Sequence, residues 1–300
     1  MQYFLNIFNI SLSESHLWKE IQMIIFAIPL RAAETSSDWN GCITRFNQTL
    51  NSIFNQTNDS FKCIVACNEM PTLYKEYDGR LEFMLLDLPA PKEWIDMARD
   101  KFWKLTAIAV RIREILETQP DPEKGIYVMP VDADDLLNKN IAEYCVNHPD
   151  ENGLVSHGGY VWKTGDKYIR KYPNLHTYCG SCNIIKMYRD DLPDKLPFPN
   201  EFCHDGEVAR KLNEKYPIRF DHNMVVELYS KAGKPFSYLP FRSTIYVRNT
   251  GDNISCINQK EYLTNQKDRL HPIAFIRKFN LFKIQVITNR IKDDFGWIGK

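Results

Sequence analysis

Apolar residues form short continuous runs and longer one-sided patterns that alternate along the first half of the chain. The one-sided patterns, at 39–54 and 100–117, repeat at helical spacing. Four runs are predominantly apolar, as buried strands are: 23–30, 61–67, 81–88 and 125–131. Because strands that alternate with helices pair in parallel, the pattern predicts an α/β fold with a mostly parallel, Rossmann-like sheet flanked by helices.

The second half of the chain has a different pattern. A helix is expected at 136–148, and strands are expected at 153–162, 178–185 and 241–247. No low-complexity linker interrupts residues 23–256, so we expect one continuous domain. Its nucleotide-sugar half is 23–135, and a smaller acceptor-side region is 136–256. Outside it we expect an N-terminal extension, 1–22, and a C-terminal helical extension, 257–300.

Composition narrows the classes of partner. Lys plus Arg and Asp plus Glu both number 38, so no overall charge draws the protein to nucleic acid. The eight cysteines mostly lie in apolar runs, as buried thiols do in a reducing compartment. Cys179 and Cys182 form a lone C-x-x-C, for which we favour packing over metal or redox work. With no signal-peptide pattern, we expect a cytoplasmic protein.

The run at 125–131 ends in three carboxylates within four positions, Asp132, Asp134 and Asp135. Side chains at i and i+2 of an extended chain share a side, so Asp132 and Asp134 are expected to face one way. Two such carboxylates repel each other unless a divalent cation lies between them, and Mg²⁺ or Mn²⁺ prefers oxygen ligands. The alternative is that the cluster only caps the next helix. We expect both, with Asp135 as the cap.

Two further patterns suggest ligand contacts. Lys101 and Lys104 are expected in the first turn of a helix, where a cation is disfavoured unless an anionic ligand compensates; solvated lysines are the alternative. Tyr160 and Trp162 belong to an aromatic and polar stretch suited to stacking on sugar rings, although aromatic residues in strands are more often core. The basic, apolar segment from His271 could lie on a membrane face or against a partner, but a helix packed on the domain is favoured.

These features together resemble the nucleotide-sugar-dependent glycosyltransferases of the GT-A fold, and in particular the inverting family 2 group. The resemblance covers residues 23–256, and its most specific element is Val131-Asp132-Ala133-Asp134-Asp135. The other matching residues are Ile28-Pro29, Asn68-Glu69, Lys101 with Lys104, Cys179-Gly180-Ser181, His204-Asp205 and the turn from Arg248 to Asn253.

The resemblance implies roles for individual residues. Asp132 would contact the ribose or the water shell of the metal. Ala133, beside it, would also contact the nucleotide sugar. Asp134 would ligate the cation that bridges the diphosphate, and Lys101 or Lys104 would assist it. The nucleoside would be held by Pro29, Arg31, Glu34, Asn68 and Glu69.

The resemblance also implies a general base, for which Asp205 is the choice because the family has an acidic residue just before a helix there. The family often has two acidic residues at this point, whereas this chain has His204-Asp205. His204 is therefore an alternative base or an additional metal ligand. A helix cap beside a surface histidine is the structural alternative for the pair.

The resemblance implies metal-dependent transfer of a sugar from a nucleoside-diphosphate sugar to a glycan or lipid-linked acceptor, with inversion. A UDP-sugar is the favoured donor. Cell-surface polysaccharide assembly at the inner face of the membrane would suit it, with peripheral contact through the C-terminal segment. A nucleotidyltransferase is disfavoured because the loop at 29–34 has no glycine to grip a triphosphate. A non-catalytic glycan- or partner-binding protein that keeps the fold is the third alternative.

Overall fold

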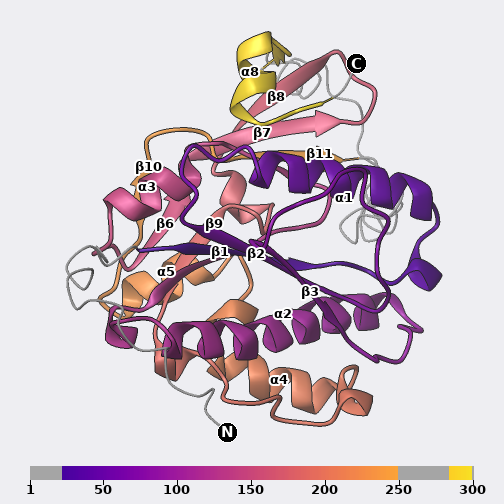
Figure 1. Cartoon of the computed structure of the whole chain (residues 1–300), viewed down its shortest axis with the longest axis vertical. Coiled ribbons are helices and arrows are strands. Elements are labelled where there is room, and N and C mark those ends of the chain that lie inside the picture. The colour runs from indigo at the N-terminus through magenta and orange to yellow at the C-terminus, as the bar shows by residue number, and fades with distance from the viewer. Residues whose placement is uncertain (1–21, 249–283, 299–300) are drawn as a thin grey trace, which may run out of the picture.

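The computed structural model describes residues 22–248 and 284–298, which form two sheets with helices around them (Figure 1). The larger sheet has its strands in the order β10-β6-β9-β4-β1-β2-β3. Their bounds are β1 Ile24–Pro29, β2 Phe61–Cys67, β3 Leu81–Leu85, β4 Ile126–Pro130, β6 Gly153–Ser156, β9 Asn183–Met187 and β10 Ser237–Leu239.

The four strands predicted in the first half of the chain form the parallel part of this sheet. β1 pairs in parallel with β2 and with β4, and β2 pairs in parallel with β3. β9 is antiparallel to both of its neighbours, β4 and β6, so the sheet is mixed. Because β1, β2 and β4 run in the same direction, their carboxyl ends, at Pro29, Cys67 and Pro130, lie at one edge.

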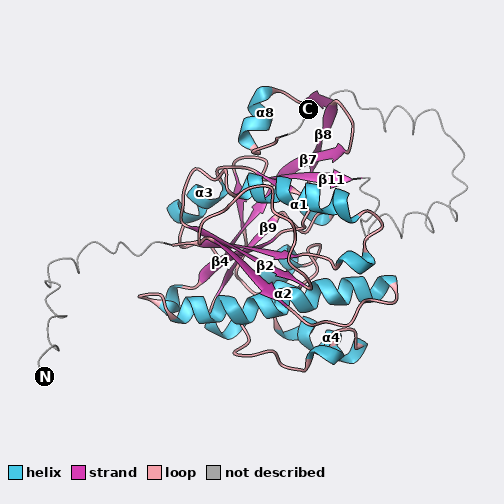
Figure 2. Cartoon of the chain, turned by 45° about the vertical axis from the view of Figure 1, so that its right-hand side comes forward, coloured by secondary structure: helices cyan, strands magenta, loops and turns pink. Residues whose placement is uncertain are grey.

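Helices cover both faces of the larger sheet (Figures 1 and 2). Successive residues of β1 point to opposite faces, as the pleat requires: Phe26 packs with the buried side of α1, and Ala27 packs with that of α2. α1 and α3 lie on the first face, and α2, α4 and α5 lie on the second. Their bounds are α1 Trp39–Ile53, α2 Trp94–Glu117, α3 Ile141–Asn147, α4 Gly206–Lys215 and α5 Val225–Lys231.

Helix starts depend on local capping. The side chain of Asp38 accepts a hydrogen bond from the backbone N–H of Gly41, which makes Asp38 the N-cap of α1. α2 begins at Trp94, not at Asp100, because Glu93 and Asp96 form a capping box at its first turn. The prediction that Lys101 and Lys104 lie in the first turn of this helix is therefore wrong.

A second sheet, which the sequence analysis did not predict, has the order β12-β8-β7-β11-β5. The predicted strand at 153–162 divides at His157, so that β6 joins the larger sheet and β7 the second one. The predicted helix from 136 also divides, because residues 136–137 form β5 and α3 begins at Ile141. The bounds are β5 Leu136–Leu137, β7 Gly158–Lys163, β8 Tyr168–Pro173, β11 Thr244–Arg248 and β12 Ile284–Val286.

The described part of the C-terminal extension contains a strand as well as a helix. β12 pairs with β8, and α8, Asn289–Asp294, packs Ile291 onto the second sheet with Phe295 and Trp297. The amphipathic positions at 273–282 and the N-terminal extension at 1–21 lie outside the described residues. None of the helices at 22–248 or 284–298 is long and apolar enough to cross a bilayer.

Candidate functional site

A cleft of about 430 Å³ opens where β1 and β4 end and where α2 passes beneath them. Ligands of open α/β sheets bind at such an edge. Six residues predicted for the site line this cleft: Pro29, Arg31, Lys101, Asp132, Ala133 and Asp134. The edge of the sheet thus brings together residues that are a hundred positions apart in the sequence.

The acidic motif after β4 is a turn and not a continuation of the strand. The backbone N–H of Asp135 donates to the carbonyl of Asp132 at 3.1 Å, which closes the turn. Asp132 and Asp134 both line the cleft, as predicted, but the turn rather than strand alternation gives them this shared side. Burial, followed by the charges of Asp134 and Asp132, raises the pKa of Asp135 well above its usual range.

Asp135 does not cap a helix, so that prediction is wrong. Its carboxylate is fully buried and accepts hydrogen bonds from Ser181 Oγ at 2.7 Å and Cys179 Sγ at 3.2 Å. The backbone N–H of Val247 donates to it as well, at 3.1 Å. Ser181 Oγ in turn accepts the backbone N–H of Asp132 at 2.8 Å. Asp135 therefore ties the acidic turn to the loop before β9 and to β11.

The charges on the cleft-facing carboxylates are only partly balanced. Lys101 forms an ion pair with Asp132; burial opposes the charged amine, but this pair raises the pKa of Lys101 overall. Burial, and then the charge of Asp132, raises the pKa of Asp134 to about 7, although Arg45 and Lys101 act in the opposite direction. A bound cation would lower the pKa of Asp134, because it would favour the ionised carboxylate against both burial and the charge of Asp132.

The donor set suits a cation that shares its ligands with phosphate. Among the described residues, no group of three or more His, Cys, Asp or Glu side chains is placed to hold a metal ion. Mg²⁺ keeps several waters and takes only one or two carboxylates when substrate phosphates supply the rest. Asp132 and Asp134 meet that requirement, so the residues present fit a nucleotide-bound Mg²⁺ or Mn²⁺.

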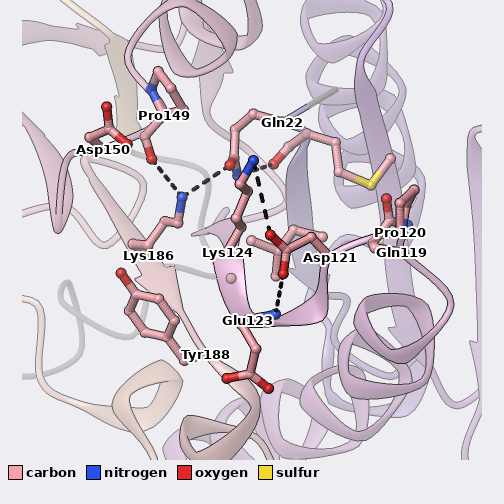
Figure 3. A pocket seen from close by; sticks show the side chains of 13 residues that line it. Gln22, Gln119, Pro120, Asp121, Glu123, Lys124, Pro149, Asp150, Lys186 and Tyr188 are labelled. Atoms are coloured by element: carbon pink, nitrogen blue, oxygen red, sulfur yellow. Dashed lines mark hydrogen bonds and ion pairs between the residues drawn. The ribbon is translucent and has the colours of Figure 1, made fainter. Parts of the chain in front are cut away.

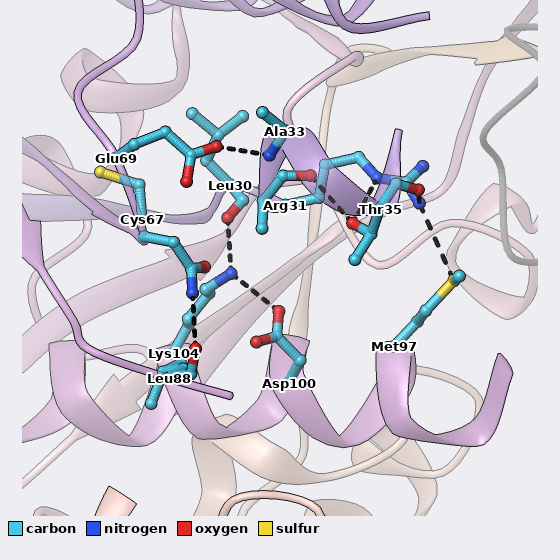
Figure 4. Close-up of polar contacts among 12 residues, drawn as sticks. Leu30, Arg31, Ala33, Thr35, Cys67, Glu69, Leu88, Met97, Asp100 and Lys104 are labelled. Carbon is cyan, nitrogen blue, oxygen red and sulfur yellow. Dashed lines mark hydrogen bonds and ion pairs between the residues drawn. The ribbon is translucent and has the colours of Figure 1, made fainter. Parts of the chain in front are cut away.

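Lys104 lies away from the cleft, unlike Lys101. Its side chain is fully buried, and its Nζ donates to Asp100 Oδ2 at 2.7 Å and to the carbonyl of Leu30 at 2.8 Å (Figure 4). These bonds fasten α2 to the end of β1. The prediction that Lys104 contacts a ligand is not supported by this placement, because the amine is buried in the protein.

The other residues predicted to hold a nucleoside line a neighbouring cavity, beyond the turn at 31–35. Glu34, Asn68 and Glu69 line it, together with residues 85–88 after β3. Glu69 accepts a hydrogen bond from the backbone N–H of Ala33, which fixes the turn between the two cavities (Figure 4). On the cleft side of this turn, Arg31 donates to the carbonyl of Thr35 at 2.7 Å.

His204 and Asp205 lie at the start of α4 and are not among the residues that line the cleft. Asp205 Oδ1 accepts the backbone N–H of Val208 at 2.8 Å, which makes Asp205 the N-cap of the helix. The carbonyl of His204 accepts a hydrogen bond of 2.9 Å from Arg99. This geometry agrees with the alternative that Asp205 caps a helix.

The charged or titratable residues that line the cleft and that the sequence analysis missed include Arg45, Asp221 and His222. His222 Nδ1 lies 3.4 Å from Asp221 Oδ1, and the Asp221 side chain is 56% exposed. Burial lowers the pKa of His222, and Lys101 acts in the same direction. An acid next to a histidine in the sequence could have indicated Asp221 and His222. The pair His204 and Asp205 has the same pattern, so the pattern alone does not distinguish the two pairs.

Tyr160 is buried in the core and Trp162 is partly buried against it, so their placement does not support the prediction that they bind an acceptor. Both side chains lie on the face of β7 that packs against α8. The Tyr160 ring is 5.9 Å from that of Phe295, and the Trp162 ring is 4.6 Å from that of Trp297. The aromatic residues Phe102, Tyr178 and Tyr246 do line the cleft.

Another cavity, of about 350 Å³, lies at the opposite edge of the larger sheet, beside the start of β4 (Figure 3). Its buried cation, Lys186, donates to the carbonyl of Pro149 at 2.6 Å and to Gln22 Oε1 at 3.0 Å. Burial lowers the pKa of Lys186 to about 8. Asp121, Glu123, Lys124 and Asp150 also line this cavity.

No protein-family model matches this sequence, and no curated protein matches it.

Proposed function

We propose that this protein is a metal-dependent glycosyltransferase of the GT-A fold that uses a nucleoside-diphosphate sugar. The observation that carries the proposal is the pair Asp132 and Asp134, which face one cleft at the carboxyl edge of the parallel strands. The raised pKa of Asp134 supports it, because a divalent cation would relieve the repulsion between these carboxylates.

Asp132 and Asp134 would hold Mg²⁺ or Mn²⁺ together with the diphosphate of the donor. When bound, the cation would neutralise the charge that develops on the leaving nucleoside diphosphate. Lys101 and Arg45 add positive charge to the same cleft. The nucleoside would extend along Pro29 and Arg31 toward the cavity of Glu34, Asn68 and Glu69, with a UDP-sugar as the favoured donor.

An inverting transfer needs a base that removes the proton of the acceptor hydroxyl. Asp221 is our candidate, because its exposed carboxylate lines the cleft beside His222. Asp205 and His204 remain the alternative pair drawn from the resemblance. The acceptor is a glycan or a lipid-linked sugar, and a cytoplasmic enzyme at the inner face of the membrane suits such an acceptor.

The test is calorimetric titration of the full chain with UDP, GDP, CDP and dTDP, each with Mn²⁺ and with chelator. We expect Mn²⁺-dependent binding of one nucleotide, and loss of that binding in Asp134→Ala. Asp194→Ala, at an exposed carboxylate outside the cleft, is the matched control and should bind normally. If none of the four nucleotides binds, the proposal is wrong.

Two other functions make different predictions in the same titration. A non-catalytic glycan- or partner-binding protein would show no metal-dependent nucleotide binding. A nucleotidyltransferase would prefer triphosphates, but the turn from Leu30 to Thr35 has no glycine at which a triphosphate could approach the backbone closely. The glycosyltransferase is therefore the function we test first.

A further inference from the structure

One face of the second sheet continues from the cleft and carries a concentration of cations and tyrosines. Paired residues of neighbouring strands share a face, so the pairs Tyr246↔Val161 and Arg248↔Lys163 place these residues together. The pair Val161↔Arg170 extends the same face onto β8. We call it the basic face; its polar and aromatic residues are Lys163, Tyr168, Arg170, Tyr172, Tyr246 and Arg248.

The opposite face of this sheet is core, which fixes the direction of the side chains. Tyr160, Ile169, Ile245 and Val247 alternate with the residues of the basic face and pack against α8. The basic face therefore points away from α8. Near the cleft it is covered by the loop that contains Cys179 and Cys182, which packs on Val161, Tyr172 and Tyr246.

The basic face is joined to the cleft by aromatic residues. Tyr246 belongs to both, and Tyr178, which is 59% exposed, also lines the cleft. The Tyr178 ring meets that of Tyr172 edge-to-face, with centroids 5.0 Å apart. Burial raises the pKa of Tyr172, Tyr178 raises it further, and the charge of Arg248 lowers it, which places that guanidinium near the ring.

Two cations of this face, Lys163 and Arg170, have no acidic partner in the part of the chain that the structure describes. Lys163 and Arg170 are exposed, and neither forms an ion pair within residues 22–248 and 284–298. Asp166, in the turn between β7 and β8, is the acidic residue nearest to them in sequence. The whole chain has equal numbers of acidic and basic residues, so this concentration is local. Adjacent strands are about 5 Å apart, which sets the spacing between cations.

We propose that the basic face binds the acceptor and that the acceptor is an anionic glycan. This inference rests on the proposed function, because it assigns the acceptor of the same cleft. The terminal sugar would enter the cleft past Tyr178 and Tyr246, and preceding sugars would lie on Tyr172 and Tyr168. Their carboxylate or phosphate groups would pair with Lys163 and Arg170, since a planar guanidinium group matches both anions and an ammonium group binds them as a point charge.

The experiment measures binding of the full chain to oligogalacturonate, to poly(glycerol phosphate) and to neutral dextran of similar length. The test variant is Lys163→Gln/Arg170→Gln, and Tyr168→Ser tests stacking without a change of charge. The matched control, Lys195→Gln/Arg210→Gln, removes the same charge from exposed sites elsewhere. We expect one anionic oligomer to bind about tenfold more weakly to the test variant than to the wild type or the control.

The two anionic oligomers distinguish a carboxylate-bearing acceptor from a phosphate-bearing one, and preference for either supports the proposal. The proposal would be overturned if dextran bound as tightly as the anionic oligomers. It would also be overturned if the test and control double variants bound the anionic oligomers equally well. A third outcome would also overturn it: the wild type binds phosphatidylglycerol vesicles, the test variant does not, and neither binds an oligomer. The basic face would then be a membrane-docking surface. Mn²⁺-dependent nucleotide binding, measured in the same samples, shows separately whether the proposed donor site exists.

Discussion

The hydroxyl of Ser181 donates a hydrogen bond of 2.7 Å to the buried carboxylate of Asp135. The same hydroxyl accepts the backbone N–H of Asp132, so one side chain holds both ends of the acidic turn. The position of Asp132 and Asp134 thus depends on a residue that does not itself line the cleft.

Ser181→Ala should weaken both the fold and the proposed nucleotide site. Loss of a hydrogen bond to a buried carboxylate should lower the free energy of unfolding by about 1–3 kcal/mol. Mn²⁺-dependent nucleotide affinity should fall as well, because the turn loses its support. Urea unfolding and calorimetry measure the two effects. Thr44→Ala, at an exposed helix position, is the control; a variant with lower stability but wild-type affinity would show that Ser181 does not position the carboxylates.

Lys101 and Lys104 should respond in opposite ways to replacement by methionine. Lys104→Met leaves Asp100 buried without its cation and should cost about 3–5 kcal/mol of the free energy of unfolding. Lys101→Met should change that free energy by less than about 1 kcal/mol, since Lys101 is partly exposed, but should reduce nucleotide affinity. Unfolding and nucleotide titration of both variants check this. A stable Lys104→Met protein that binds no nucleotide would contradict our assignment.

Asp221→Asn should remove transferase activity while donor binding is retained. Loss of a general base typically reduces kcat by about 10²–10⁴. Asp205→Asn, its matched comparison, should retain activity and lose at most about 1 kcal/mol of stability as a weakened helix cap. The measurement is kcat for both variants, once a donor is identified by titration. An inactive, stable Asp205→Asn enzyme beside an active Asp221→Asn enzyme would return the base to the position that the resemblance implies.

Gly180 limits the space beside the acidic turn. A Cβ atom at this position would lie 3.8 Å from both Asp132 Oδ2 and Lys101 Nζ, which is ordinary contact. Gly180→Ala should therefore bind nucleotide normally, whereas Gly180→Leu should block the cleft and reduce nucleotide affinity about tenfold or more. Gly79→Leu is the control, because nothing lies within 4 Å of its Cβ position. Normal binding by Gly180→Leu would place the ligand away from this wall.

Local patterns were sufficient to predict the parallel part of the larger sheet. β2 occupies the predicted residues, because an apolar run acts over a few positions. The acidic turn was found for the same reason. The prediction that Asp132 and Asp134 share a side held, even though a turn and not a strand gives them that arrangement.

The features that sequence reasoning missed depend on long-range pairing. β7 and β11 are more than eighty residues apart, and their pairing decides that Tyr160 is core while Tyr246 lines the cleft. The sequence around Asp205 and that around Asp221 each offer an acid beside a histidine. Their different positions follow from α4 and the chain after it, which local patterns do not specify.

Asp134 should make the protein less stable as pH rises. Its pKa is about 7 in the folded protein, against an ordinary value of 3.8, so between these values the folded state binds more protons than the unfolded state. Stability therefore falls between about pH 4 and pH 7. Asp134→Asn removes this effect and should raise the free energy of unfolding near pH 8 by about 1–3 kcal/mol, a figure reduced for solvent screening. Near pH 4 the two proteins should be equally stable.

Urea unfolding with chelator at several pH values measures this difference, with Asp194→Asn, at an exposed carboxylate, as the control. Adding Mn²⁺ and the nucleotide that binds should stabilise the wild type and not Asp134→Asn, because the cation replaces the proton at Asp134. If wild type and Asp134→Asn differ in stability by the same amount at all pH values, the pKa of Asp134 is not raised in the folded protein. In that case, neither burial nor the charge of Asp132 would favour a cation at Asp134.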